Sequence, residues 1–156
     1  MMKIINKENF RKIPDAIFLD IDNTIYDYEL AHSFALAAVK TKALKTFSIS
    51  EKEFDNAFSE AKIQVKSNLK NTAASHNRLL YMQRMLEIIG LKSQILLSLD
   101  FEQTYWRNFF VNATLFENVL EFLDEIRLLN IPLIAITDLT AQIQFRKIIY
   151  FGLDNY

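Results

Sequence analysis

Two carboxylates stand directly after a short apolar run near the start of the chain. The run AIFLD ends in Asp20, and a second acid, Asp22, follows two residues later. A spacing of two directs both side chains roughly the same way out of the end of a strand. Because two carboxylates this close repel each other, either one takes up a proton or a cation lies between them.

Both outcomes are chemically useful. One carboxylate can attack phosphorus while the other donates a proton to the leaving group and later accepts one. A hard cation such as Mg²⁺ would bind carboxylate and backbone oxygens here and offset the charge of a phosphate. The plainer alternative is that Asp20 and Asp22 only cap a turn, as acids after strands often do. The apolar run followed by DIDNTI favours the catalytic interpretation.

Two apolar runs are predicted to be strands that position these acids. Residues 16–20 follow Pro14, and residues 131–137, IPLIAIT, are β-branched, apolar and opened by a proline. Continuous apolar runs of this length are typical of parallel strands buried on both faces. Polar or acidic residues follow each run, and chemistry in open parallel sheets collects at the carboxyl ends of the strands.

Helical periodicity fills the interval between the two runs. The second helical segment opens with a capping box, Ser50 to Glu53. Gly90 is predicted to end the third segment and Ser93 to cap the fourth. The first segment, about residues 28–47, places these residues on one face: Leu30, Phe34, Ala37, Thr41 and Leu44.

The rest of the helical pattern frames the second strand. The fourth segment carries a dense aromatic cluster that we expect to be helical core rather than a base-stacking surface, since few basic residues interleave. A fifth segment, about residues 117–130, leads into the second strand, and a final helix, about residues 140–151, follows it. The aromatic cluster comprises Tyr105, Trp106, Phe109 and Phe110.

Composition excludes several classes of function. The formal net charge of the 156 residues is −1, so no basic field indicates a nucleic acid polymer as partner. The N-terminal sequence predicts neither a signal peptide nor a membrane span. The chain has no cysteine, which excludes disulfides and is compatible with a cytoplasmic location.

The stretch around the two acids resembles motif one of the haloacid dehalogenase superfamily, hhhh-D-x-D-x-T-[LI]. Residues 17–25 match this motif, with residues 17–19 as the apolar positions, Asp20 and Asp22 as the two acids, Thr24 as the threonine and Ile25 as the final apolar residue. The resemblance implies that Asp20 is a nucleophile that forms an aspartyl-phosphate. It also implies that Asp22 is the general acid/base, that its backbone carbonyl helps Asp20 to hold Mg²⁺, and that Asn23 and Thr24 bind phosphate.

Motif two of this superfamily is an apolar strand that ends in Ser or Thr. The run IPLIAITD is similar to it, which implies that Thr137 binds the phosphoryl oxygens and that the backbone N–H of Asp138 assists. True dehalogenases of the superfamily lack the second acid of motif one. Its presence as Asp22 therefore implies hydrolysis of a phosphate ester rather than of a halide.

The resemblance also implies a fold. We expect an α/β protein with a partial Rossmann-like core of parallel strands, residues 1–27 and 114–156, and an inserted helical-bundle cap, residues 28–113. The patterns DIDNTIYDYELAH and SHNRLLYMQRMLEIIG resemble the branch that holds pyrimidine nucleotidases and N-acylneuraminate phosphatases. The implied function is Mg²⁺-dependent hydrolysis of small phosphomonoesters, such as nucleotides or sugar phosphates.

Two further motifs of the superfamily, a Lys or Arg and an acidic pair, normally lie beyond the end of this sequence. Lys147 is too early for the basic motif, and we interpret it as a solvated helix residue. Two apolar strands alone would expose their edges, so we expect a missing C-terminal segment or a homo-oligomer to cover them. The alternatives are a non-catalytic remnant that binds a partner, and a purely helical interaction module.

Three residues of the expected cap are weaker candidates for substrate contact. His76 and Arg78 lie near a polar loop that could reach over a substrate phosphate, and Arg can bind phosphate with two parallel hydrogen bonds. A helix start with solvated charges is the interpretation that we favour for both. His32 lies on the first cap helix, where it could line the mouth of the site, although we favour a role in helix packing.

Overall fold

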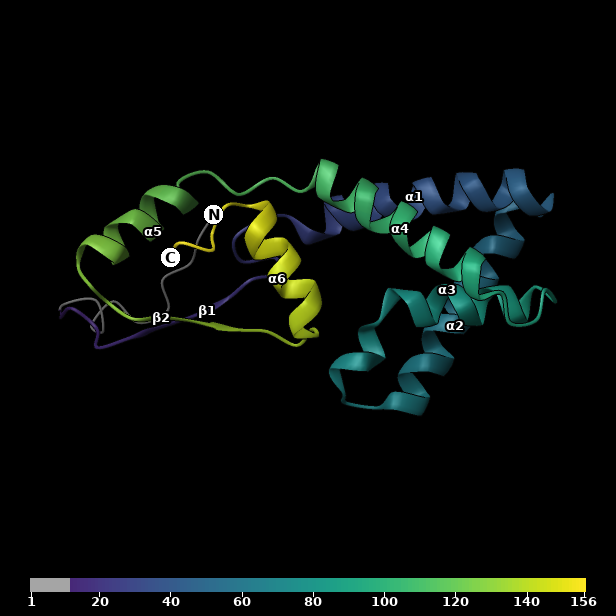
Figure 1. The fold of residues 1–156 in the computed structure, drawn as a ribbon, viewed down its shortest axis with the longest axis horizontal. Helices are drawn as coiled ribbons and strands as arrows, with labels where there is room; N and C mark the ends of the chain where they lie inside the picture. Colours follow the sequence, from purple (N-terminus) through teal and green to yellow (C-terminus); the bar gives the residue numbers. More distant parts are fainter. Residues whose placement is uncertain (1–11) are drawn as a thin grey trace.

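The computed structural model describes residues 12–156 of the chain (Figure 1). It is dominated by helices and holds one parallel sheet of two strands. The elements in chain order are β1 (Ile17–Asp20), α1 (Tyr28–Phe47), α2 (Glu51–Leu69), the 3₁₀ helix η2 (Ala73–His76), α3 (Arg78–Ile88), α4 (Ile95–Asn112), α5 (Val119–Leu128), β2 (Leu133–Ile136) and α6 (Ala141–Tyr150).

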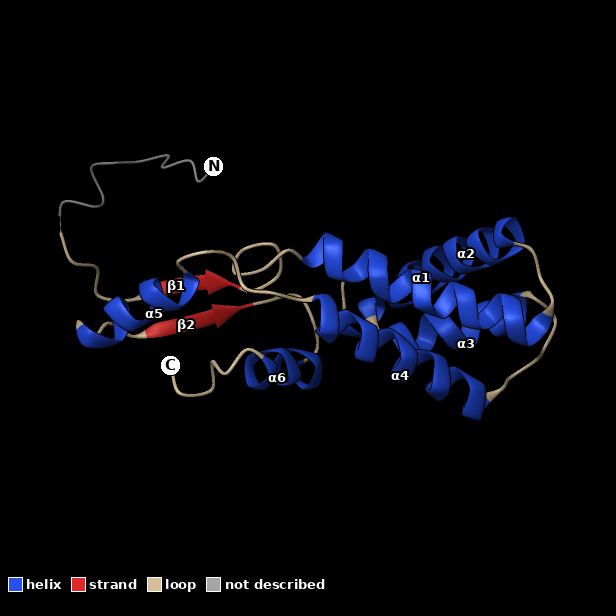
Figure 2. Cartoon of the chain, turned by 90° about the horizontal axis from the view of Figure 1, so that it is seen from above, coloured by secondary structure: helices blue, strands red, loops and turns tan. Residues whose placement is uncertain are grey.

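The helices α1–α4 gather at one end of an elongated molecule, and the strands lie with α5 and α6 at the other end (Figure 2). The predicted α/β class with a helical insertion between the two strands is confirmed. The expected domain boundaries, after residue 27 and before residue 114, stay a prediction. Among the described residues, no helix is both long enough and apolar enough to cross a membrane.

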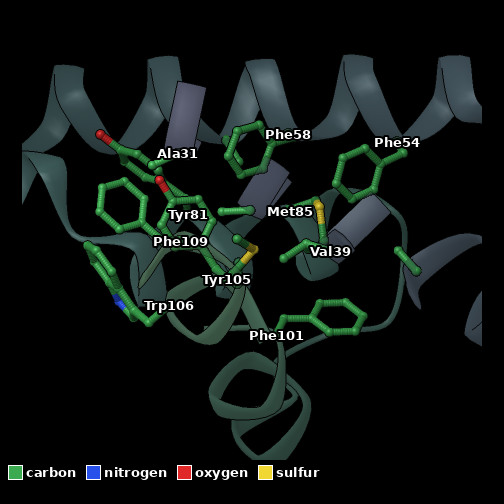
Figure 3. Packing of buried hydrophobic residues seen from close by; sticks show 14 of the residues in the cluster. Ala31, Val39, Phe54, Phe58, Tyr81, Met85, Phe101, Tyr105, Trp106 and Phe109 are labelled. Carbon is green, nitrogen blue, oxygen red and sulfur yellow. The ribbon is translucent and has the colours of Figure 1, made fainter. Parts of the chain in front are cut away.

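Small residues let α1 approach α4 closely. Ala31, Ala35, Val39 and Ala43 recur every four residues and are fully buried. Aromatic side chains of α4, among them Tyr105 and Phe109, fill the space beside them (Figure 3). The expected aromatic core is therefore confirmed.

The face predicted for α1 is wrong. Leu30 is 48% exposed and Phe34 is 50% exposed, so of the three large apolar residues of the predicted face only Leu44 packs against the core. The partner helix carries bulky aromatic residues, so close packing selects the alanine face of α1 rather than its larger side chains. Side-chain size was therefore the wrong criterion for this helix.

Two of the three predicted helix boundaries are confirmed. The capping box exists, because the Ser50 hydroxyl accepts from the Glu53 N–H over 3.2 Å and the Ser50 N–H donates to Oε2 of Glu53 over 2.8 Å. Gly90 lies two residues after the end of α3 with φ of +88°, a value that favours glycine. Ser93 does not cap α4; the helix starts one residue later, where the carbonyl of Gln94 accepts from the Ser98 N–H over 2.9 Å.

The two strands pair in parallel, with Ile17 opposite Leu133 and Asp20 opposite Ile136. Their carboxyl ends therefore meet at one edge of the sheet. The prediction that both faces are buried is wrong for these residues, because Phe18 is 65% exposed and Ile136 is 55% exposed. Within the described residues the sheet has only two strands, so neither strand has a second neighbouring strand to cover its outer edge.

Candidate active site

A tight turn after β1 presents the first carboxylate. Asp20 ends the strand, and the Ile25 N–H donates to the Ile21 carbonyl over 3.2 Å to close the turn. Asn23 has φ of +58°, a left-handed conformation that asparagine tolerates. The Thr24 hydroxyl donates to Oδ2 of Asp20 over 3.1 Å, which holds the carboxylate in place. Asp20 itself is exposed.

Contacts on both sides anchor this turn. Ile21 and Ile25 are buried, and the Ile25 carbonyl accepts from the Phe116 N–H over 2.9 Å. Asp27 then caps α1, accepting from the Leu30 N–H over 2.9 Å. The turn therefore runs without a break from the strand that carries Asp20 into the first helix of the bundle.

Three donors converge on the carboxylate of Asp22. Nζ of Lys147 lies 2.5 Å from Oδ1, and the Tyr26 hydroxyl donates to the same oxygen. The side-chain amide of Gln144 donates to Oδ2 over 3.3 Å. The interpretation of Lys147 as a solvated residue is wrong, because its side chain is 0% exposed. The sequence predicted either a bound proton or a cation between the two neighbouring carboxylates. At Asp22 this cation is the ammonium group of Lys147.

Aromatic rings surround the Lys147 ammonium. Its Nζ lies 5.8 Å from the ring centroids of Tyr26, Tyr28 and Phe109, a distance at which a cation is attracted by the ring faces. Burial lowers the pKa of Lys147, and the nearby Asp22 carboxylate opposes that shift. Burial also raises the pKa of Tyr26, as does its hydrogen bond to Asp22, so its hydroxyl keeps the proton that it donates.

The second strand brings Thr137 to the same edge. Thr137 follows directly after Ile136, the residue opposite Asp20. The amide of Gln144 donates to its hydroxyl as well as to Asp22, so one buried side chain links both strand ends. Gln144 is 2% exposed, and its Oε1 is buried without a hydrogen-bond partner.

These residues open onto a cavity of about 430 Å³, a size typical of small-molecule sites. The strand ends contribute Asp20, Asp22, Asn23, Thr137 and Asp138, whereas Thr24 reaches the site only through its bond to Asp20. The bundle contributes the three cap candidates together with residues that had not been considered. The full bundle contribution is Tyr28, Glu29, His32, Phe58, Lys62, Lys66, His76, Arg78 and Tyr81.

Arg78 is not the solvated residue that we favoured. It is 8% exposed and donates to the carbonyl of His76 over 2.6 Å and to the Tyr28 hydroxyl. Its guanidinium carbon lies 5.4 Å from the ring centroids of Tyr81 and Tyr105. Aromatic side chains from α3 and α4 thus bury an arginine that the sequence places at an exposed-looking helix start.

Both histidines that line the cavity have lowered pKa values. His32 packs in the bundle as favoured, with its Nδ1 2.6 Å from the Tyr105 hydroxyl, and it also lines the cavity. Burial lowers the pKa of His32 to about 4, and Arg78 adds to that shift. Burial also lowers the pKa of His76, as do the cations nearby.

The oxygens at the strand ends fit a hard cation in part. Asp20 offers a carboxylate at the cavity, and the backbone carbonyl of Asp22 is a second hard oxygen of the kind that Mg²⁺ binds. The Asp22 carboxylate is engaged by its three donors. Within residues 12–156, no three acidic or histidine side chains gather closely enough to hold a metal ion. Water ligands complete many Mg²⁺ sites of this kind.

The sequence of residues 14–156 matches the profile of a hydrolase family described as haloacid dehalogenase-like hydrolase. The chain belongs to this family. The resemblance to haloacid dehalogenase-like hydrolases that residues 17–25 indicated is therefore confirmed.

Among curated proteins, the chain is similar to ribulose-1,5-bisphosphate 5-phosphatase of Halopiger xanaduensis. The two are 28% identical over 142 residues, which cover 90% of this chain and 59% of the relative. The chain therefore spans about three fifths of the length of that curated relative. This curated relative is a phosphatase, which agrees with the presence of the second acid, Asp22.

Solved structures show the same fold. YfnB of Bacillus subtilis, described as a HAD-hydrolase bound to magnesium, aligns with a TM-score of 0.56 and 14% identity over 88% of this chain and 60% of its own. The 2-haloacid dehalogenase of Pseudomonas syringae aligns with a TM-score of 0.59 and 18% identity over 92% of this chain and 61% of its own. At these identities the likeness concerns the fold alone.

Sequence reasoning missed the residues of α6 and α2 at the site. Gln144 and Lys147 are three residues apart and form the buried face of α6, whereas Phe145 and Ile149 on the same helix are 62% and 67% exposed. An apolar pattern predicts burial of Ile143 and Ile148, which do pack against the core, but it does not predict burial of the two polar residues. The available signal was the i, i+3 spacing of two polar residues directly after motif two.

Proposed function

We propose that the complete protein is a Mg²⁺-dependent hydrolase of small phosphomonoesters. The complete protein means the full product of the coding region that contains these residues. The observation that carries the proposal is the placement of an exposed carboxylate, Asp20, beside Thr137 and beside a second carboxylate that is held by three donors. A nucleophile, an acid/base and a phosphoryl ligand are thus gathered at one edge of the sheet.

The proposed reaction has two steps. An oxygen of Asp20 attacks phosphorus, the ester P–O bond breaks, and Asp22, which takes up a proton when the substrate binds, delivers that proton to the departing alkoxide. Water then attacks the acyl phosphate, gives a proton to Asp22 and releases inorganic phosphate, which restores both carboxyl groups. Thr137 and the backbone N–H of Asp138 orient the phosphoryl oxygens, with Asn23 and Thr24 beside them. Mg²⁺ bound at Asp20 and the Asp22 carbonyl would offset the phosphate charge.

Lys147 makes the site more receptive to phosphate. A phosphate dianion that approaches two carboxylates meets strong repulsion, and an ammonium 2.5 Å from Asp22 offsets one of the two negative charges. Tyr26 and Gln144 fix the orientation of the same carboxylate before a substrate arrives. We assign Lys147 and Gln144 the role of positioning residues for Asp22.

Small phosphorylated metabolites are the proposed substrates, either sugar phosphates or nucleotides. The curated relative, whose name specifies a sugar bisphosphate, supports the first of these classes. We place the enzyme in the cytoplasm, with which the absence of cysteine is compatible. A further segment of the complete protein, or a second copy, would cover apolar sheet residues such as Phe18 and Ile136.

The test is turnover of p-nitrophenyl phosphate by the complete protein with Mg²⁺. We expect Asp20→Asn to lose activity by at least about 1000-fold, because the amide cannot form the acyl phosphate. Asp15→Asn, a change at an exposed acid outside the cavity, serves as the matched control and keeps normal rates. Equal rates for Asp20→Asn and the parent protein would contradict the proposal.

A second candidate function is a non-catalytic binding module. It is favoured by the lack, within residues 12–156, of an acidic cluster that would complete a metal shell. Residues 1–156 alone should then bind inorganic phosphate or a partner without turnover. Hydrolysis by those residues alone at the rate of the complete protein would exclude this candidate.

A further inference from the structure

The bundle lines the cavity with positive charge. Lys62 and Lys66 lie one turn apart on α2, and Arg78 begins α3; all three line the same cavity as Asp20 and Thr137. The mechanism proposed above uses none of these three cations. They reach the cavity from the helical insertion, whereas the reacting groups reach it from the strand ends.

These cations lack acidic partners in the part of the chain that the structure describes. None of Lys62, Lys66 and Arg78 forms an ion pair with an acid of residues 12–156. Burial lowers the pKa of Lys62. The charges of Lys66 and Arg78 lower the pKa of Lys62 further, and only the charge of Glu29 opposes this shift. Three positive charges thus lie close enough to repel one another around an open cavity.

Arg78 is built into this wall rather than lying on its surface. It is 8% exposed, its terminal nitrogens are used by the His76 carbonyl and the Tyr28 hydroxyl, and its Nε is buried without a hydrogen-bond partner. Burying a guanidinium with a donor unused costs free energy unless a ligand or water compensates. A rigid cation of this kind is suited to recognition of an anion.

We propose that Lys62, Lys66 and Arg78 form a subsite for a second anionic group of the substrate, so that the substrate is a phosphomonoester with an additional phosphate or carboxylate. The inference rests on the proposed function, because the ester phosphate occupies the Asp20 and Thr137 side of the cavity. The rest of the substrate then extends toward the bundle. A neutral leaving group would leave the three cations facing one another with Glu29 as the one acid of the bundle that lines the cavity beside them.

The experiment compares matched substrates on the complete protein. Fructose 1,6-bisphosphate is measured against fructose 6-phosphate, and 3-phosphoglycerate against glycerol 3-phosphate, which separates a second phosphate from a carboxylate. We expect kcat/KM to be at least about tenfold higher for the doubly charged member of one pair or both. Lys62→Met/Lys66→Met should abolish that preference while leaving the singly charged esters within about threefold.

Lys52→Met provides the matched control, because Lys52 is exposed on α2 and does not line the cavity. It should keep the preference. Equal loss of both members of a pair in the double variant would mean that the lysines serve the reacting phosphate, and it would overturn the subsite. No preference in the parent protein would overturn it as well.

A binding measurement keeps the inference testable apart from turnover. Calorimetric titration of the Asp20→Asn protein with fructose 1,6-bisphosphate and fructose 6-phosphate should give tighter binding of the bisphosphate, and the added lysine changes should remove the difference. Failure of the proposed function appears as no turnover of any ester. Failure of the subsite appears as equal binding and equal turnover within each pair.

Discussion

Replacing either member of the Lys147–Asp22 pair should have unequal effects on stability. Lys147 is 0% exposed, whereas Asp22 is 24% exposed and keeps Tyr26 and Gln144 as donors when the lysine is removed. Lys147→Met therefore leaves a carboxylate that water and two donors still solvate. Asp22→Asn leaves an ammonium in a fully buried position, with aromatic rings and an amide oxygen but no bonded carboxylate to offset its charge.

The magnitudes follow from what each change leaves behind. An uncompensated buried charge costs about 3–5 kcal/mol, and access to water reduces that cost. Burial already lowers the pKa of Lys147 despite Asp22, so removing its charge also relieves a desolvation cost. We expect Lys147→Met to change the free energy of unfolding by no more than about 1 kcal/mol and Asp22→Asn to lower it by about 3 kcal/mol.

Urea unfolding of the complete protein at pH 7 measures both values, with the double variant to complete the cycle. The pKa of Lys147 is lower in the folded state, so the unfolded state binds more protons below pH 10.5 and stability rises with pH there. The deficit of Asp22→Asn should therefore shrink between pH 8 and 10. A larger loss from Lys147→Met than from Asp22→Asn would refute the reasoning.

Further predictions concern the bundle, the site and the metal. Burial lowers the pKa of His32 to about 4, so protonation of His32 favours the unfolded state. As the pH drops from 6.5 to 4, the free energy of unfolding of the parent protein should fall by about 2 kcal/mol more than that of His32→Phe, as measured by urea unfolding. Ala35→Leu should overpack α1 against α4 and lower the free energy of unfolding by about 2 kcal/mol, whereas Ala37→Leu at an exposed position should change it by less than about 0.5 kcal/mol. Gln144→Leu should lower kcat about tenfold with little change in KM, because Thr137 and Asp22 lose a shared donor. Chelation should abolish phosphatase activity of the complete protein, and Mg²⁺ should restore it better than Ca²⁺, which binds at longer distances.

The strand ends were predictable because local chemistry determines them. A continuous apolar run of this length favours a strand, and the polar residue that ends it lies at the sheet edge, so Asp20 and Thr137 lie where they were predicted. The capping box at Ser50 is likewise a local signal, since donor and acceptor lie within one turn. Strand bounds differed by one or two residues, as the apolar run continues past the hydrogen-bonded ladder.

The errors share a different cause, which is the identity of a distant partner. Lys147 is buried because it meets an acid 125 positions away, and Arg78 is buried because aromatic residues of other helices enclose it. The alanine face of α1 is buried because α4 supplies the bulk. None of these partners can be inferred from residues within one helix, whose own pattern favours exposure of charge and burial of size.

One aromatic side chain connects the two halves of the cavity. The Tyr28 ring lies 5.8 Å from Nζ of Lys147, and its hydroxyl accepts from Arg78. The charge of Arg78 contributes to the lowered pKa of Lys147, so the cation at the strand ends and the cation of the bundle repel each other. An anion in the cavity offsets that repulsion, whereas a neutral ligand leaves it in place. The electrostatics of this site therefore favour an anion beside Arg78, because Asp22 already compensates Lys147 whereas Arg78 forms no ion pair with an acid of residues 12–156.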